Sequence, residues 1–248
     1  MIIGLISDIH EDIVSLRKAI NYLNSIKVDE IVCLGDITGY SDLHYYPIKE
    51  TRNASECIKV ISENCKYVVG GNHDYFSARQ IPVFKAGFTY PDNWYLLKPS
   101  ERKKLSANKL WFYEDEEIPG NLNDDDLIFL SGLPEFKIID NILLSHFIYP
   151  DLSGATMKFP KSKRFFKNHL NFQLEKSCDI SFCGHAHYGG IALATRKKFN
   201  ILAFGTYKID SFPCCVSLPC IANCAIINGV TIFDTNTYEL KVQNLSDN

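Results

Sequence analysis

Residues 2–10 read IIGLISDIH, an apolar run that leads directly into two polar side chains, Asp8 and His10. A short, continuous apolar run of this kind is typical of a strand buried on both faces. Loops that follow such strands expose side chains on a fixed backbone, and α/β proteins build their sites there. The stretch therefore predicts an α/β fold with candidate site residues at the end of its first strand.

Strands alternate with helices in the following part of the chain. Apolar residues recur every three or four positions from Ile13 to Ile26, which predicts an amphipathic helix. A second helix is expected over about 51–63, and buried strands are expected at 30–34 and 67–69. Alternation in units this short predicts a sheet with parallel strands at its centre.

The second half of the chain is rich in predicted strands. They cover residues 136–139, 142–145, 180–183, 191–195, 201–204, 224–227, 230–233 and 238–242. The dipeptide Asn228-Gly229 is typical of a hairpin turn between two of them. A helix-rich first half and a strand-rich second half predict two packed sheets with helices outside.

The segment at about 75–134 differs in composition from the rest. It is rich in aromatic residues and carries two acidic groups, at 114–117 and 124–126. Asn123, followed by three aspartates, predicts the start of a helix, and we expect the acidic groups to form a solvated surface. Because there is no repeat or flexible linker, we expect one domain over 1–248 with this segment inserted.

Composition and charge narrow the class of protein. The chain is 46% hydrophobic and 22% charged with a net charge of −3, which excludes a disordered chain and argues against nucleic-acid binding. No apolar run approaches the ~20 residues of a membrane helix, and nothing at the start reads as a signal peptide. We therefore expect a cytoplasmic protein.

The nine cysteines are scattered through apolar stretches, which favours reduced thiols. Four of them, Cys214, Cys215, Cys220 and Cys224, lie close together in sequence. Their spacing lacks a pair of Cys-x-x-Cys motifs, so we expect buried thiols there and no structural zinc.

Polar segments that carry metal-ligand chemistry follow five of the predicted strands, and they hold five of the seven histidines. The candidate ligands in them are Asp8, His10, Asp36, Asn72, His146, His185 and His187. Imidazole and carboxylate ligands without thiolate suit divalent ions of the manganese, iron and zinc series. Seven ligands are too many for one ion but suit two ions that share a bridging aspartate.

The charge of such a site predicts its substrate. The net charge of such a site is an excess of roughly +1. It is the sum of the charges of two divalent ions, two aspartates and a bridging hydroxide, because the remaining ligands are neutral. This excess attracts an anion and stabilises negative charge that develops in a transition state. Phosphate esters meet both demands.

The segments Asp8-x-His10, Gly35-Asp36, Gly71–Asp74 and Gly184–His187, with His146, resemble the calcineurin-like metallophosphoesterase superfamily from residue 2 to about 205. The resemblance implies a four-layer α/β/β/α sandwich of two mixed sheets. It implies a first ion on Asp8, His10, Asp36 and His187, and a second on Asp36, Asn72, His146 and His185, with Asp36 bridging. The expected cofactors are two divalent ions, Mn²⁺ before Zn²⁺, Fe²⁺ or Ni²⁺.

The implied reaction is attack of a dimetal-bridging hydroxide on phosphorus. His73 lies beside a ligand but is not needed as one, so we expect it to be the general acid that protonates the departing alkoxide. The alternative is that His73 only orients Asn72.

Departures from the superfamily bear on the substrate. Protein phosphatases have Asp-Arg-Gly after their Gly-Asp pair, whereas this chain continues with residues 37–40, ITGY. A Gly-Tyr pair at this place is common in the small prokaryotic phosphodiesterase branch, which the chain resembles more closely. That branch often has Gly-Asn where Glu11-Asp12 stands here, which we expect to add negative charge near the entrance. It usually carries an Asn-Pro-Gly-Ser turn in the place of residues 203–207.

We therefore expect a phosphodiester or nucleotide as substrate. The alternatives are a phosphomonoesterase, a dinucleoside-polyphosphate hydrolase and a non-catalytic scaffold of the same fold. Substrate choice is expected in loops 37–50 and 147–167 and in the segment after Asp74. The nearby basic cluster of Lys158, Lys161, Lys163, Arg164 and Lys167 is expected to be a solvated helix face.

Overall fold

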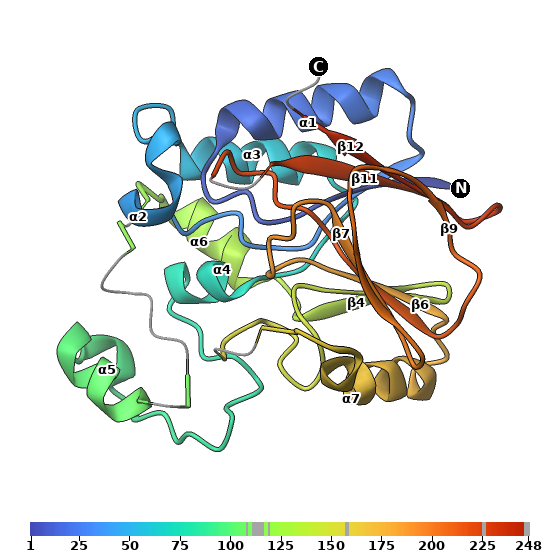
Figure 1. The fold of residues 1–248 in the computed structure, drawn as a ribbon. Coiled ribbons are helices and arrows are strands. Elements are labelled where there is room, and N and C mark those ends of the chain that lie inside the picture. The colour runs from blue at the N-terminus through green and yellow to red at the C-terminus, as the bar shows by residue number, and fades with distance from the viewer. Residues whose placement is uncertain (108, 111–116, 119, 157–158, 225–226, 246–248) are drawn as a thin grey trace.

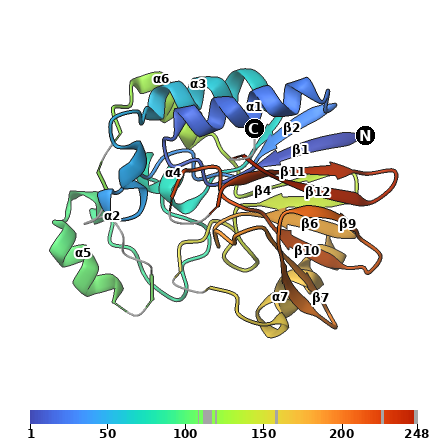
Figure 2. The same cartoon turned by 45° about the horizontal axis from the view of Figure 1, so that its top comes forward.

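Two six-stranded sheets lie face to face in the computed structural model, which describes residues 1–107, 109–110, 117–118, 120–156, 159–224 and 227–245. The order of the first sheet is β3-β2-β1-β11-β12-β9 and that of the second is β4-β5-β6-β10-β7-β8. Helices cover the outer face of each sheet, so the layers run helix, sheet, sheet, helix (Figures 1 and 2). The predicted four-layer sandwich of two mixed sheets is confirmed.

The strands of the first sheet are β1 (Ile2–Ile6), β2 (Glu30–Cys33), β3 (Tyr67–Val68), β9 (Gly205–Lys208), β11 (Gly229–Asp234) and β12 (Glu239–Asn244). Those of the second are β4 (Phe136–Ile139), β5 (Ile142–Ser145), β6 (Ile180–Cys183), β7 (Ile191–Thr195), β8 (Phe199–Leu202) and β10 (Cys214–Ser217). β1, β2 and β3 are mutually parallel, as are β5, β6 and β10, while the other pairings are antiparallel.

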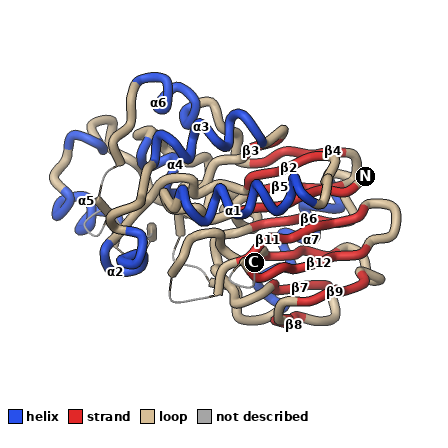
Figure 3. Tube along the Cα trace, turned by 90° about the horizontal axis from the view of Figure 1, so that it is seen from above, coloured by secondary structure: helices blue, strands red, loops and turns tan. Residues whose placement is uncertain are grey.

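The α-helices are α1 (Ile13–Ser25), α2 (Asp42–Tyr45), α3 (Ala54–Asn64), α4 (Asn72–Ser77), α5 (Pro99–Ser106), α6 (Asp124–Ser131) and α7 (Lys163–Glu175). Two 3-10 helices cover Tyr46–Ile48 and Trp94–Leu96. α1 and α3 cover the first sheet and α7 covers the second, whereas α2 and α5 lie beyond one end of the strands (Figures 1 and 3). No helix in the described ranges is long and apolar enough to cross a membrane.

Alternation along β1 builds two separate layers of core. Ile3 and Leu5 are buried between the sheets, while Ile6 packs beneath α1 and α3. Gly4 faces the same helices, and a Cβ there would lie 2.9 Å from the Leu23 side chain. The missing side chain therefore lets α1 pack directly against the strand.

The segment at about 75–134 divides into two parts. α6 packs against α3 and α4, and its Leu130 is buried in the core beneath α1 and α3. Phe88, Trp94 and Leu110 form a separate small apolar cluster. The predicted helix start is confirmed, because the Asn123 side chain accepts from the Asp126 N–H at 3.0 Å.

Two predictions about the strands were wrong, and two strands were not predicted. Cys224 and Ile227 are not in a strand, and residues 225–226 lie outside the described part. Gly229 begins β11 rather than forming a turn, because its N–H bonds to the Cys220 carbonyl; the hairpin turn lies between β11 and β12. β9 and β10 were not predicted, because each has only four residues and lacks a continuous run of large apolar side chains.

His169, on α7, is fully buried. Its Nδ1 accepts from the Tyr149 N–H at 2.9 Å, which leaves the Nε2–H to donate to Ser181 Oγ at 2.9 Å. Ser181 Oγ donates in turn to Oε1 of the Gln173 side chain at 3.0 Å. This chain of bonds requires the neutral ring, and burial lowers the pKa of His169 to about 3.

Stability is therefore expected to fall when pH drops below the ordinary histidine pKa. Between about pH 6.5 and 3 the unfolded chain binds a proton at His169 that the folded chain excludes, which removes up to ~1.4 kcal/mol of unfolding free energy per pH unit. Urea unfolding of metal-free protein at pH 7 and pH 5 measures this. His169→Gln is expected to be less stable at pH 7 but to have a shallower pH dependence. An equal pH slope in both proteins would contradict the assignment.

Candidate metal centre

The predicted ligands lie at the carboxyl ends of five parallel strands, at one edge of the two sheets. Asp8 and His10 follow β1, Asp36 follows β2, and Asn72 follows β3 at the start of α4. His146 follows β5, and His185 and His187 follow β6. Parallel strands place these loops at the same edge, and the structure brings all seven side chains together there.

The backbone of this edge is unusual. Asp8, His10, Asp36, His185 and His187 all have positive φ, between 46° and 67°. Residues with side chains rarely adopt this left-handed conformation, which carries a conformational cost. Five strained residues in one place indicate that the surrounding structure fixes these side chains for a function.

Two glycines of the motifs allow the loops to approach one another closely. A Cβ at Gly71 would lie 2.1 Å from Asp36 Oδ1, and a Cβ at Gly184 would lie 1.9 Å from Ser7 Oγ. A side chain at either position would therefore push apart the loops that carry the candidate ligands.

One group of donor atoms forms around Asp8. His187 Nε2 lies 3.0 Å from Asp8 Oδ1 and 3.2 Å from His10 Nε2. His10 Nδ1 donates to the Gly39 carbonyl at 2.9 Å, and burial lowers the pKa of His10 to about 3. The ring is therefore neutral, and the lone pair of Nε2 faces the other two groups, as metal ligation requires.

A second group forms around His146. Its Nε2 lies 3.0 Å from Asp36 Oδ2 and 3.3 Å from His185 Nδ1, and His185 Nδ1 lies 3.1 Å from Asn72 Oδ1. His146 Nδ1 donates to the Leu34 carbonyl at 2.7 Å, which fixes the ring with Nε2 toward the site.

The electrostatics of both groups favour positive charge. Burial opposes charge on His146, but the nearby Asp36 carboxylate outweighs burial and raises the pKa of His146 to about 10. Burial likewise opposes charge on His187, and Asp8 outweighs it and raises the pKa of His187 to about 10. The pKa of both carboxyls is held below its usual range despite burial, Asp8 chiefly by His187 and Asp36 chiefly by His146. Each carboxylate thus stabilises a cation beside it.

The donor set fits two divalent ions. Asp8, His10 and His187 form one cluster, and Asp36, His146 and His185 form another, each with its donor atoms within 4.8 Å of one another. Asp36 Oδ2 lies 3.0 Å from His146 Nε2 and 4.0 Å from His10 Nε2, so it faces both clusters. Mixed oxygen and imidazole donors at this spacing suit the manganese, iron and zinc series.

His73 lies at the edge of these clusters. The backbone N–H of His73 donates to Asp36 Oδ1 at 3.0 Å, and its ring packs edge-on against His10 with centroids 5.0 Å apart. Burial opposes charge on its ring, but the Asp36 and Glu117 carboxylates outweigh burial and raise the pKa of His73. The structure thus places beside the candidate metal ligands an imidazole whose protonated form is favoured by two carboxylates.

Glu117 is the residue near the centre that the sequence analysis missed. Its Oε2 lies 2.7 Å from His73 Nδ1, and its side chain is only 5% exposed. The expectation of a solvated acidic surface at 114–117 is wrong for Glu117, while 114–116 lie outside the described residues. The signal was the acidic group itself, but nothing local indicated which of its members turns inward.

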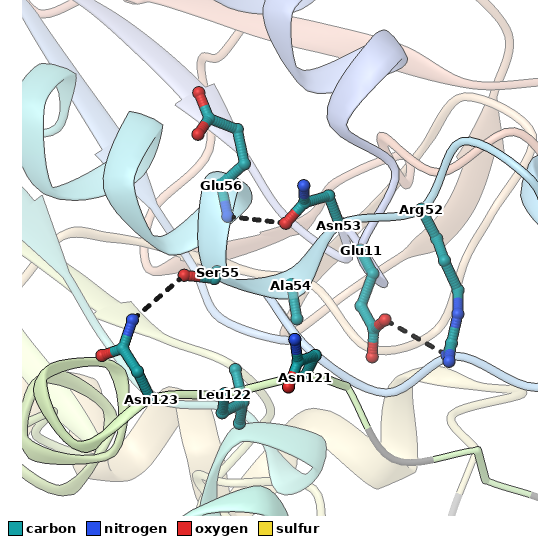
Figure 4. Close-up of a pocket in the computed structure, with 9 residues that line it drawn as sticks. All are labelled: Glu11, Arg52, Asn53, Ala54, Ser55, Glu56, Asn121, Leu122 and Asn123. Carbon is teal, nitrogen blue, oxygen red and sulfur yellow. Dashed lines mark hydrogen bonds and ion pairs between the residues drawn. The ribbon is translucent and has the colours of Figure 1, made fainter.

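A fixed strand contact holds Glu117 in place. The Ile118 N–H donates to the Tyr40 carbonyl at 2.8 Å, and Arg52 donates to the Ile118 carbonyl at 2.9 Å. Arg52 also pairs with Glu11 at 3.3 Å and lies over the Tyr40 ring. Figure 4 shows this ion pair among the residues that line a pocket. The pocket has a volume of about 490 Å³, and its lining residues are Glu11, Arg52, Asn53, Ala54, Ser55, Glu56, Asn121, Leu122 and Asn123.

The expectation that Glu11 and Asp12 add charge near an entrance is wrong, because both are buried. Burial raises the pKa of Glu11 to about 7, against the opposing effect of Arg52. Asp12 caps α1 by accepting from the Ser15 N–H and also accepts from the Asn223 N–H at 2.8 Å. Both side chains hold the loop after β1 rather than face solvent.

Asp74 has a similar holding role. It accepts hydrogen bonds from the N–H groups of Ile37, Thr38 and Gly71, so it ties the loop after β2 to the loop after β3. Burial, aided by Asp36, raises the pKa of Asp74 to about 6. Asp74, for which the sequence predicted no role, thus fixes the relative positions of Asp36 and Asn72.

Aromatic side chains near the centre are used in packing. Tyr40, Tyr45 and Tyr75 are buried, and Tyr45 stacks on His10 with ring centroids 4.4 Å apart.

The basic cluster that was predicted to be a solvated helix face is exposed as expected. Its exposed members are Lys161 and the α7 residues Lys163, Arg164 and Lys167, while Lys158 lies outside the described part.

Comparison with known proteins agrees with this geometry. Residues 1–189 match the family model of the calcineurin-like phosphoesterases. An uncharacterized protein of Methanocaldococcus jannaschii is 39% identical over 201 residues, which cover 81% of this chain and 67% of that protein. The crystal structure of a metallophosphoesterase from Sphaerobacter thermophilus superposes with a TM-score of 0.66 at 17% identity, covering 98% of this chain and 87% of that one.

The chain belongs to the calcineurin-like phosphoesterase family. Members of this family are metal-dependent, and the His and Asp clusters described above are groups that can hold metal. The class of protein is therefore a metal-dependent phosphoesterase.

Proposed function

We propose that this protein hydrolyses a phosphodiester or nucleotide with two divalent ions, Mn²⁺ before the alternatives. The observation that carries the proposal is the position of Asp36, whose Oδ2 lies 3.0 Å from His146 Nε2 and 4.0 Å from His10 Nε2, between two donor clusters. Two ions held there would activate water and neutralise charge on the phosphoryl oxygens. The first would be held by Asp8, His10, Asp36 and His187, and the second by Asp36, Asn72, His146 and His185.

The charge at the centre favours a diester. The charges of two ions, two aspartates and a hydroxide sum to roughly +1. This net positive charge matches the single negative charge of a diester. Protein phosphatases add an arginine after the Gly-Asp pair, where this chain has Ile37 and Thr38 bonded to Asp74. The arginine that would suit a doubly charged monoester is thus absent from this place, and the residues there bind Asp74, which holds two loops together.

His73 and Glu117 are proposed to handle the proton of the leaving group. Nδ1 of His73 donates to the Glu117 carboxylate at 2.7 Å, which orients the ring and stabilises its protonated form. We assign the protonation of the departing alkoxide to the opposite ring nitrogen, Nε2. Glu117 is a positioning residue, because it acts through His73.

Substitution of Glu117 tests this pairing. Glu117→Gln keeps the size but removes the charge that stabilises the imidazolium, so we expect turnover to fall on the order of 10- to 100-fold with little change in KM. Bound metal, measured by elemental analysis, is expected to be unchanged. In a His73→Asn background the substitution is expected to cause no further loss. Glu63→Gln, on the exposed face of α3, is the control; an equal loss there, or additive losses, would contradict the pairing.

Metal removal tests the function as a whole. Protein stripped with a chelator is expected to lose hydrolysis of bis-nitrophenyl phosphate and to regain it with Mn²⁺, and to a lesser degree with Zn²⁺ or Mg²⁺. Mono-nitrophenyl phosphate is expected to be hydrolysed more slowly. Activity in the stripped protein would refute the metal mechanism. A preference for the monoester would refute the diester proposal, and inactivity on every ester under all metals would favour a scaffold.

A further inference from the structure

Two cysteines lie against the candidate metal centre. Cys220 and Cys224 form a cluster with His187, and one donor atom of each residue lies within 4.8 Å of the others. The two sulfurs are 3.6 Å apart, and the Cys224 thiol hydrogen-bonds the His187 side chain. Neither cysteine forms a disulfide, in line with the expectation of reduced thiols. Their approach to His187, which lies 33 or more residues earlier in the chain, could not be predicted from the spacing of the cysteines.

The spacing suits one tetrahedral ion. Two thiolates bound at ~2.3 Å to a tetrahedral ion stand about 3.8 Å apart. The observed separation of 3.6 Å is within a few tenths of an ångström of that value. His187 supplies an imidazole as a third ligand, and its side chain is 20% exposed, so solvent can provide the fourth.

The backbone from Cys220 to Asn223 is held in place without an ion. The N–H groups of Ile221 and Ala222 donate to the Asp8 carbonyl at 3.2 and 3.0 Å, and the Asn223 N–H donates to Asp12. The Gly229 N–H donates to the Cys220 carbonyl at 3.0 Å. Binding therefore requires little ordering of the chain, which is the main requirement for a tight site.

We propose that His187, Cys220 and Cys224 form a site for a thiophilic ion such as Zn²⁺ or Cd²⁺, distinct from the two ions of the proposed function. Soft thiolate donors select such ions over Mn²⁺ and Mg²⁺. On binding, the two thiols each release a proton to solvent and the sulfurs coordinate as thiolates. Because His187 is also a ligand of the proposed first ion, occupancy of the thiolate site withdraws it and inhibits hydrolysis. This last consequence rests on the proposed function, whereas binding itself does not.

Cadmium titration of the metal-free full chain tests binding directly. We expect ultraviolet thiolate-to-cadmium charge-transfer absorption that saturates at one thiolate-bound ion per chain. Cys220→Ser and Cys224→Ser are expected to weaken the affinity of this site at least ~10-fold. Cys65→Ser, a partly exposed cysteine at the end of α3, is the matched control and is expected to keep the absorption. The proposed site would be refuted if the unsubstituted chain showed no such absorption. It would also be refuted if the absorption persisted in a variant that carries both Cys220→Ser and Cys224→Ser. Circular dichroism of each variant verifies folding.

An activity measurement separates the two proposals. In Mn²⁺-loaded protein, one equivalent of Cd²⁺ is expected to inhibit diester hydrolysis, and Cys220→Ser is expected to require at least ~10-fold more Cd²⁺ for equal inhibition. Equal sensitivity of both proteins would overturn the competition for His187. If the Mn²⁺-loaded protein has no activity, the proposed function fails, while the absorption titration still decides the thiolate site.

Discussion

Replacement of Asp36 by asparagine is expected to reduce hydrolysis of a phosphodiester by roughly 10³-fold or more, the equivalent of several kcal/mol of transition-state stabilisation. Asp36 Oδ2 lies 3.0 Å from His146 Nε2 and 4.0 Å from His10 Nε2, so its carboxylate is the group proposed to bridge both ions. An amide carries no charge and cannot bridge as a carboxylate does. Elemental analysis is expected to find less than two bound ions per chain.

Asp42→Asn is the matched control for this substitution. Asp42 begins α2 in the same loop region, and its carboxylate bonds to Tyr40 and Lys49 rather than to a candidate ligand. We expect its metal content and activity to match those of the unsubstituted protein. Full occupancy by two ions and normal turnover in Asp36→Asn would show that this carboxylate does not bridge.

Replacement of His73 by asparagine is expected to lower turnover by ~10²–10⁴-fold while both ions stay bound. His73 is not among the proposed ligands, and its ring donates to Glu117 at 2.7 Å beside the candidate centre. The loss is expected to be greatest for esters with poor alkyl leaving groups, because an alkoxide needs the proton more than a nitrophenolate does. Steady-state kinetics on a matched pair of alkyl and nitrophenyl esters measures the difference.

His44→Asn, at an exposed histidine of α2, controls for the loss of an imidazole near the site. Its kinetics are expected to be unchanged for both esters. If His73→Asn slowed the two esters equally and also lost metal, His73 would be an orienting neighbour of Asn72 rather than the acid. Unchanged hydrolysis of the alkyl ester would remove His73 from the chemistry altogether.

The sequence predicted the layers of the fold because the signals for them are local. Continuous apolar runs such as Ile2–Ile6 identified the buried strands, and the three-to-four-residue spacing from Ile13 identified α1. β10 escaped this reasoning because four residues, two of them cysteines, make a weak pattern. β9 escaped it because its four residues, Gly205–Lys208, contain no apolar run, and pairing with β12 makes the segment a strand.

The candidate ligands could be predicted for a similar reason. Each follows a strand by a few residues, and parallel strands bring such loops to one edge whatever lies between them in sequence. The roles of Glu11, Asp12 and Glu117 could not be predicted in this way. Each depends on a partner from another loop, as Glu11 does on Arg52 and Glu117 on His73, 44 residues away.

By itself, therefore, the sequence determined a layered α/β protein with seven candidate metal ligands and an adjacent histidine, because periodicity and strand-end motifs act over short distances. Only the tertiary structure decided which acidic side chain contacts His73 and which cysteines approach His187. Those contacts depend on how loops pack across the edge of two sheets, and burial changes the charge and partners of each group once they meet.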